Sequence, residues 1–315
     1  MKSLSLLSMA LYFTISLICI VTTDGAVEAE EIREAAKAGT WYSADPERLK
    51  KDIDALTSRA KESHVQIPAN KNLKAIILPH AGIACSGWTA AHASLVLTGR
   101  QYPKVILMGP DHYRVFKNAG ISDVSGYQTP LGAVKLHPEA KKLRLNTGMF
   151  QSSLVSDRNE HSLEMVLLFL QSYIKDFELI PIVVGPTNIP QFATQLDNIL
   201  DSDTLLVVSS DLYHFLPYDE VVARDKETIA WITNPKAADP SDIEKRACGI
   251  KPLSILRYLA QQHNWQPVLL HYSNSGDTCG DRTSVVGYAA IAFFGDQGMQ
   301  ETNKSNQKLS EAQGN

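Results

Sequence analysis

Cysteine is scarce in this chain of 315 residues, and no two of its four cysteines have the Cys-x-x-Cys spacing of a structural zinc knuckle. Cys19 lies in an apolar first segment, so Cys85, Cys248 and Cys279 remain for the rest of the chain. An odd number of cysteines in an oxidising compartment implies at least one free thiol. A bound metal ion would give such a thiol a reason to stay unpaired.

A clustered basic face, which a nucleic-acid-binding protein needs, is also missing. The formal net charge is −4, and the longest local basic cluster is Lys141, Lys142 and Arg144. We interpret this cluster as the solvated face of a helix. The sequence therefore predicts no nucleic-acid partner.

Long apolar runs occur only at the N-terminus. Lys2 precedes a mostly apolar run from Ser3 to about Val21, and small and acidic residues follow it. A charged start, an apolar stretch and a small-residue cleavage zone are typical of a signal peptide, here residues 1–29. We therefore expect an exported protein, periplasmic or extracellular. An uncleaved anchor that leaves the protein facing outside is the alternative, because the run approaches the ~18–20 residues that span a bilayer.

Neither an internal repeat nor a linker divides the remainder, so we expect one α/β domain over residues 30–296 and a disordered polar tail over 297–315. A polar segment, Glu30–Lys37, is expected to be helical, and Asp45-Pro46 is expected to start a helix. Short β-branched runs predict buried strands. These are Ala75–Leu78, Val105–Met108, Leu179–Val184, Leu205–Val208, Val268–Tyr272 and Val285–Phe294.

Helical spacing separates most of these strands, at Thr89–Gly99, Ser162–Lys175, Gln191–Leu200, Asp219–Thr233 and Pro252–His263. Alternating strands and helices favour a mostly parallel or mixed central sheet with helices on both faces. The last two strands flank a Gly-containing loop, so they are candidates for an antiparallel hairpin.

Three predicted strands run into a histidine. Pro79-His80 follows one strand, Asp111-His112 follows another, and the third continues through Asp211 to His214. In open α/β sheets, ligands bind outside the carboxyl ends of the strands. We therefore predict that the three imidazoles meet at one site.

Neutral imidazoles bind divalent transition metals, and an anionic ligand commonly completes the set. The candidates for that ligand are Cys248, Asp211, Asp111 and Glu164. Cys248 precedes a predicted helix, whose N-terminus would favour the thiolate. His161 lies three residues before Glu164 and shares a helix face with it, although capping of that helix by Glu160 and Glu164 explains the segment equally well.

Seven segments give a more specific indication. They are AGTWY, LPHAG, MGPDHY, EHSLEM, SSDLYHF, ACGIKP and GDRTSVVGYAAIAFF, and in this order and spacing they resemble the MEMO family, also called AmmeMemoRadiSam system protein B. The resemblance implies a fold similar to class III extradiol dioxygenases, which use non-haem iron. It also implies that His80, His112 and Cys248 are the metal ligands. Asp211 and His214 would line the same cleft, with His214 as the acid/base residue.

Two positions depart from the family pattern. Some relatives have a histidine where this chain has Val166, and many have a second histidine where it has Tyr113. The three implied ligand positions are intact, so the resemblance still implies metal binding. It does not define the substrate.

We therefore predict a metal-dependent redox enzyme that uses iron, with copper or zinc as alternatives. A ligand- or phosphopeptide-binding module without turnover is one rival interpretation, and an extracytoplasmic metal-handling protein is another. The expected partners are a small molecule or peptide in the cleft, and the Amme-type and radical SAM proteins of the same system.

Overall fold

The fold is described from a computed structural model, which covers residues 31–113, 117–146, 148–152 and 158–296. The predicted signal peptide and the predicted polar tail lie outside the described residues. From Glu31 onwards, the described residues belong to one compact unit. Among them, no helix is both long and apolar enough to cross a membrane.

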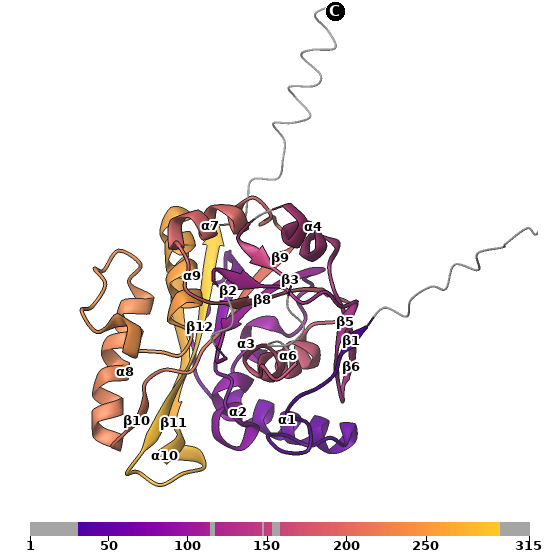
Figure 1. The fold of residues 1–315 in the computed structure, drawn as a ribbon. Helices are drawn as coiled ribbons and strands as arrows, with labels where there is room; N and C mark the ends of the chain where they lie inside the picture. The colour runs from indigo at the N-terminus through magenta and orange to yellow at the C-terminus, as the bar shows by residue number, and fades with distance from the viewer. Residues whose placement is uncertain (1–30, 114–116, 147, 153–157, 297–315) are drawn as a thin grey trace, which may run out of the picture. The chain divides into compact units, whose positions relative to one another are not determined.

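Parallel strands form the centre of the main sheet (Figure 1). In spatial order they are β2 (Lys71–Leu78), β9 (Thr204–Ser209), β3 (Lys104–Pro110) and β8 (Glu178–Val184). Next to β2 lies the antiparallel β12 (Val285–Asp296), which also pairs with β11 (Gln266–Asn274) and β10 (His214–Leu216). The other edge is formed by β4 (Ala119–Gly120) and β7 (Phe150–Gln151). The central strands are buried on both faces, which explains their continuous apolar sequences.

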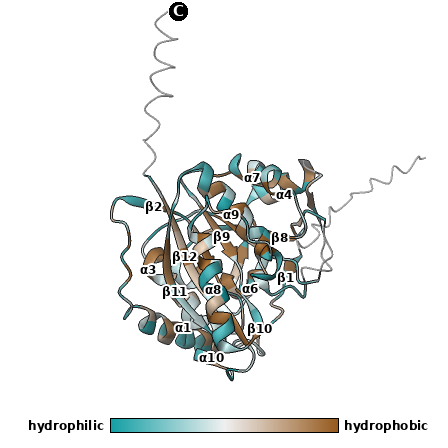
Figure 2. Cartoon of the chain, turned by 90° about the vertical axis from the view of Figure 1, so that its left-hand side faces the viewer, coloured by the Kyte–Doolittle hydropathy of each residue, from teal (hydrophilic) through white to brown (hydrophobic). Residues whose placement is uncertain are grey.

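Helices cover both faces of this sheet (Figure 1). One apolar core includes residues from α4 (Pro138–Asn146), α7 (Ile189–Asp197), α8 (Tyr218–Thr233) and α9 (Ile250–Gln262). The core on the other side includes α3 (Ser94–Leu97) and α6 (Ser162–Tyr173), and α6 also packs against α1 (Pro46–Ala60) and α2 (Ile83–Ala91). Figure 2 shows apolar colouring along the strands and mixed colouring on α1 and α8. The predicted α/β fold class is therefore confirmed.

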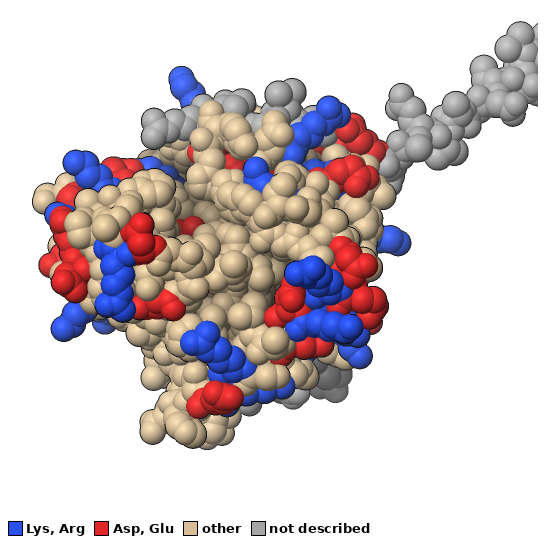
Figure 3. Space-filling model, turned by 90° about the horizontal axis from the view of Figure 1, so that it is seen from below, with Lys and Arg blue, Asp and Glu red and all other residues tan. Residues whose placement is uncertain are grey.

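Smaller elements complete the unit. A three-stranded sheet contains β1 (Ile32–Arg33), β5 (Gly126–Thr129) and β6 (Gly132–Lys135). The connection between β11 and β12 contains the short helix α10 (Ser275–Thr278), and a 3₁₀ turn, η1 (Ile243–Lys245), precedes α9. Seen from the side of α1, α2 and α10, the surface has charged residues around its rim and mostly uncharged atoms in its middle (Figure 3).

All six predicted strands are present, and the predicted hairpin is confirmed by the antiparallel pairing of β11 with β12. The helix predicted to start at Asp45-Pro46 is also confirmed, since Asp45 caps α1 by accepting a hydrogen bond from the Arg48 amide. The predicted helix over Thr89–Gly99 is wrong in its bounds. Two helices, α2 and α3, replace it, and the first of them starts at Ile83.

The helix predicted for Glu30–Lys37 is wrong over the residues that the structure describes. Ile32 and Arg33 form β1, and no helix follows them up to Lys37. The cause is the buried carboxylate of Glu164, which accepts hydrogen bonds from the Arg33 guanidinium at 2.6 Å and from the amides of Ala36 and Lys37. A buried ion pair and two charge-assisted hydrogen bonds outweigh the weak local preference for helix.

Candidate metal centre

The carboxyl ends of β2 and β3 bring two predicted ligands together. His80 stands two residues after β2 and His112 two residues after β3. Their ring centroids lie 5.2 Å apart. The prediction that these strands deliver their histidines to one place is confirmed for this pair.

His161 joins them from the start of α6. Its ring stacks on His112 with centroids 4.4 Å apart and meets His80 edge-on at 5.6 Å. One nitrogen from each of the three rings lies within 4.8 Å of the others, so His80, His112 and His161 form a group that can hold a metal ion. The sequence places His161 on one helix face with Glu164 and does not predict it as a ligand.

A glycine allows α6 to start so close to β3. A Cβ atom added to Gly109 would lie 2.5 Å from the hydroxyl oxygen of Ser162 and 2.8 Å from a side-chain carbon of Leu163. Only glycine permits this approach. Gly109 in the MGPDHY segment therefore allows His161 to reach the other two histidines.

The hydrogen bonds of His80 and His112 determine which nitrogen faces the centre. His80 Nδ1 lies 2.7 Å from the Ser209 hydroxyl, which itself donates to the carbonyl of Ser162 and so accepts from the ring. His112 Nδ1 lies 2.8 Å from a carboxylate oxygen of Glu160. In both rings Nδ1 is therefore the donor and Nε2 keeps the free lone pair, which is the arrangement of metal-binding histidines.

Glu160 is a buried residue that orients the side chains of this site through hydrogen bonds. It is 1% exposed, and besides His112 Nδ1 its carboxylate accepts hydrogen bonds from the amides of His112, His161 and Ser162. These bonds lower the pKa of Glu160 to about 2 against the opposing effect of burial. The capping role considered for Glu160 is thus present, and the same carboxylate also orients a ligand.

Cys248 contacts the histidine group. Its sulfur lies 3.3 Å from His80 Nε2 and accepts a hydrogen bond of 3.2 Å from the Asp211 amide. Two ligands of one zinc-like ion, a thiolate and an imidazole, stand about 3.5 Å apart, so this distance fits a shared ion. Gly249 allows the approach, because a Cβ there would meet the Ser210 side chain at 2.6 Å.

The charge state of the thiol differs from the expectation. We expected the N-terminus of the helix that follows to favour the thiolate, but burial, and next the nearby Asp211, raise the pKa of Cys248. Desolvation is thus stronger than the dipole of α9 in the metal-free chain. A coordinated cation reverses the balance, because it deprotonates a bound thiol outright.

The histidines are suited to metal binding at neutral pH. Burial is the main cause that lowers the pKa of His80 and His161, and the charges of neighbouring imidazoles add to it; the value for His161 is about 4. Neutral imidazoles are the form that binds metals. The buried Nδ1 of His161 has no hydrogen-bond partner among the described residues.

Asp211 and His214 lie beside this group. The Asp211 carboxylate accepts a hydrogen bond of 2.8 Å from the His80 amide, and its other oxygen is 4.0 Å from His80 Nε2. Burial raises the pKa of Asp211 to about 7. His214 begins β10, and it affects the pKa of His80 through its charge. Its nitrogens are not among those that converge within 4.8 Å.

Two other candidates for the anionic ligand have different contacts. Glu164 is fully engaged by Arg33, by two amides and by the hydroxyl of Tyr42. Asp111 accepts a hydrogen bond from the Tyr113 amide, which closes the turn after β3. The structure therefore gives Glu164 the role of anchoring residues 33–42.

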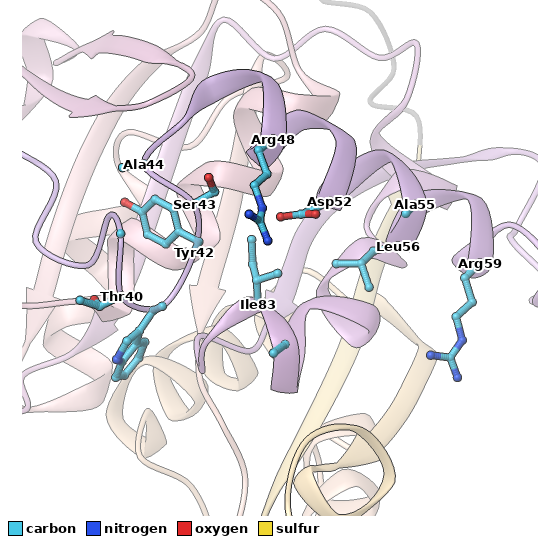
Figure 4. Close-up of a pocket in the computed structure, with 13 residues that line it drawn as sticks. Thr40, Tyr42, Ser43, Ala44, Arg48, Asp52, Ala55, Leu56, Arg59 and Ile83 are labelled. Carbon is cyan, nitrogen blue, oxygen red and sulfur yellow. The ribbon is translucent and has the colours of Figure 1, made fainter.

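Two hollows adjoin the centre. A cleft of about 470 Å³ is lined by His112, Cys248 and Lys251, among others. A groove of about 780 Å³ runs between residues 39–44, α1 and α2, with Arg48 and Asp52 projecting above Ile83 and Arg59 farther along α1 (Figure 4). Trp41 also lines this groove, and its ring is 4.6 Å from that of His161. Both volumes are in the range of small-molecule sites.

Comparison with known proteins agrees with the motifs. The family model described as Memo-like protein matches residues 33–292, which include every residue of the centre described above. The chain belongs to this family. The resemblance stated from the seven segments is thereby confirmed.

The relatives of this Memo-like chain are similar over most of their length. It is 32% identical over 280 residues to a MEMO1 family protein of Methanopyrus kandleri, with 83% of this chain and 98% of the relative covered. MEMO1 family proteins of Sulfolobus acidocaldarius and Aquifex aeolicus are also 32% identical, over 283 and 277 residues, covering 83% and 84% of this chain and 99% of each relative.

We expect Glu160→Gln to weaken metal binding by about 10- to 100-fold, the usual cost of losing the hydrogen-bond partner of a ligand histidine. The amide keeps the volume of the side chain, but it cannot accept all the hydrogen bonds that the carboxylate takes. Isothermal titration of the metal-free protein with zinc measures the change. Glu139→Gln, on the surface of α4, is the control; equal affinity for zinc in Glu160→Gln and wild type would contradict the assigned role.

Proposed function

We propose that this Memo-like protein is a metal-dependent redox enzyme that binds iron, or else copper, through His80, His112 and Cys248. The observation that carries the proposal is the contact of 3.3 Å between the free thiol of Cys248 and His80 Nε2, next to the converging histidines. Two imidazoles and one anion are the donors of many non-haem iron sites. His161 is a fourth donor within reach.

Neighbouring residues hold the three proposed ligands in orientations that suit metal binding. Ser209 and Glu160 hold the two imidazoles with Nε2 inward, and Asp211 holds the His80 backbone and donates its own amide to the Cys248 sulfur. When bound, such a metal supplies redox and Lewis-acid chemistry at its open positions. Thiolate is softer than the carboxylate of iron oxygenases, and this favours copper(I) or zinc more than a carboxylate would.

His214 is proposed to move a proton at the ligand in the cleft. Burial lowers the pKa of His214, so the ring is neutral at pH 7 and can act as a base. We expect His214→Ala to keep metal occupancy near that of wild type while turnover falls by about 10²–10⁴-fold. Metal content per chain and oxygen uptake are the two measurements, and loss of metal in this variant would make His214 a ligand instead.

Metal analysis of protein purified without oxygen, followed by oxygen uptake, tests the function as a whole. Iron at about one per chain and uptake that stops in His214→Ala would support the redox enzyme. Tight copper(I) binding without uptake would favour metal handling, for which the thiol ligand is the supporting observation.

Export of the protein is part of the proposal. In its support, Cys85 and Cys279 form a disulfide, a bond that persists in oxidising compartments. We expect the mature chain to begin between about Asp24 and Glu31. N-terminal sequencing of protein from the envelope fraction measures this, and an intact Met1 on membrane-bound material would indicate an anchor.

A further inference from the structure

Asp225, in the middle of α8, is a buried carboxylate to which the proposed function gives no role. The residue is 0% exposed. Its Oδ1 accepts a hydrogen bond of 3.0 Å from the Tyr213 amide, and its Oδ2 accepts one of 2.9 Å from the Tyr272 hydroxyl. Both donors are uncharged, and burial raises the pKa of Asp225 to about 7. A carboxylate in this place therefore costs free energy, and its contacts must explain why it is there.

The contact with Tyr213 completes the fixation of a two-residue backbone segment. The Leu212 amide donates to the carbonyl of Gly287 in β12 at 2.8 Å, and the Gly287 amide donates to the Tyr213 carbonyl at 2.9 Å. Asp225 accepts from the Tyr213 amide. A Cβ atom added to Gly287 would lie 1.8 Å from Asp225 Oδ2, so only glycine leaves room for the carboxylate at this point.

This segment joins two residues of the candidate site. Before it stands Asp211, whose carboxylate accepts from the His80 amide and whose own amide donates to the Cys248 sulfur. After it stands His214, whose ring forms a hydrogen bond with the backbone of Leu212. A displacement of the Tyr213 backbone would therefore change the orientation of the His214 ring relative to the metal centre.

A purely structural tie between α8 and the sheet is the alternative explanation of Asp225. Such a tie would not need a buried charge, because an apolar side chain of similar volume packs at least as well in many proteins. The carboxylate instead accepts from the amide that immediately precedes His214 in the chain. A strong acceptor at that place favours a role in orientation.

We propose that Asp225 is a positioning residue, which holds His214 in place for proton transfer by accepting the hydrogen bond of the Tyr213 amide. Asp225 acts through Tyr213 and is not itself a catalytic residue. The effect on turnover rests on the proposed function. The orientation of His214 does not, because every contact that sets it lies within the chain.

The orientation is tested by nuclear magnetic resonance of the full chain labelled with ¹⁵N-histidine, without metal and again with zinc. The signal that disappears in His214→Ala identifies the His214 ring. Asp225→Ala should shift this signal, because the Tyr213 backbone loses its partner. The signals of His137, before α4, and His263, at the end of α9, should not move, since both residues lie outside this network.

Asp225→Asn is the conservative variant that should restore the wild-type signal of His214. Its amide oxygen can accept from the Tyr213 amide, and its NH₂ group can donate to the Tyr272 hydroxyl. The matched control is Asp219→Ala, the same substitution at an exposed residue of α8, which should leave the signal unchanged.

Oxygen uptake by the iron-loaded chain is the second measurement. It should fall by about 10²-fold in Asp225→Ala, the order of loss that a misplaced acid/base group causes, and return to near the wild-type rate in Asp225→Asn. Metal content per chain should stay near wild type in both. If circular dichroism shows that Asp225→Ala does not fold, Gly287→Ala replaces it, because the added methyl group displaces the carboxylate from the Tyr213 amide.

An unchanged His214 signal in Asp225→Ala, or an equally large shift in Asp225→Asn, would overturn the positioning role. Uptake that is lost in His214→Ala but kept in Asp225→Ala would overturn it as well and leave the redox function standing. A wild-type chain that takes up no oxygen would refute the redox function alone, because the comparison of the His214 signals needs no turnover.

Discussion

His80→Ala, His112→Ala and Cys248→Ser are each expected to abolish stoichiometric metal binding and to leave the fold intact. A site of three or four donors loses most of its affinity when one donor is removed, because water replaces the missing ligand. His80 and His112 lie on loops after strands and Cys248 lies between η1 and α9, so none of the three belongs to the apolar cores. Metal analysis per chain measures the loss, and far-ultraviolet circular dichroism checks the fold.

His161→Ala separates two possible donor sets. If all three converging histidines bind the ion, this variant loses metal as His80→Ala does, and Cys248→Ser then has the smaller effect. If the thiol completes the set, Cys248→Ser loses metal and His161→Ala retains it. The control is His263→Ala, whose ring is exposed and paired with Asp197 away from the centre. Metal retained at the wild-type level in all four variants of the centre, as in the control, would refute the site.

Part of this site was predictable from the sequence, because ligands bind at the carboxyl ends of parallel strands. This rule needs only a strand and the residues that directly follow it. An apolar run of four to six residues followed by a histidine gives both the strand and the end at which the side chain emerges. His80 and His112 follow this pattern and lie 5.2 Å apart between ring centroids. The strand pattern also selects His214, and Cys248 is one of four anionic candidates, but the acid/base role of His214 and the choice of Cys248 come from the resemblance.

The parts that were not predictable depend on contacts between distant residues. His161 reaches the centre only because Gly109 allows α6 to approach β3, and nothing within the EHSLEM segment encodes that distance. The extended path of residues 32–37 depends on an ion pair between Arg33 and Glu164, which are 131 positions apart. The protonated thiol of Cys248 follows from burial, a property of the whole fold.

The pairing of the cysteines also depends on contacts between residues that are far apart in the sequence. The odd number of cysteines implied one free thiol but did not identify it. The structure pairs Cys85 in α2 with Cys279 after α10, which leaves Cys248 free among the described cysteines. These partners are separated by 194 positions, so no spacing rule could have identified the pair.

The double variant Cys85→Ser/Cys279→Ser is expected to lower the free energy of unfolding by about 2–5 kcal/mol. The bond closes a very long loop, and in the chain-entropy model a longer loop restricts the unfolded chain more. Urea-induced unfolding, followed by circular dichroism, measures the change. The folded state keeps other contacts between α2 and β11, including a hydrogen bond of 2.7 Å between the hydroxyls of Thr89 and Ser273, so the variant should still fold.

A reducing agent supplies the matched control for this prediction. Dithiothreitol should destabilise the wild-type protein by about as much as the double variant, and it should have no further effect on the variant, because the remaining Cys248 forms no disulfide. Cys248→Ser should stay sensitive to the agent. Equal stability of the variant and wild type would mean that the bond restricts the unfolded chain little, and that contacts of α2 with β11 and α10 hold this region without it.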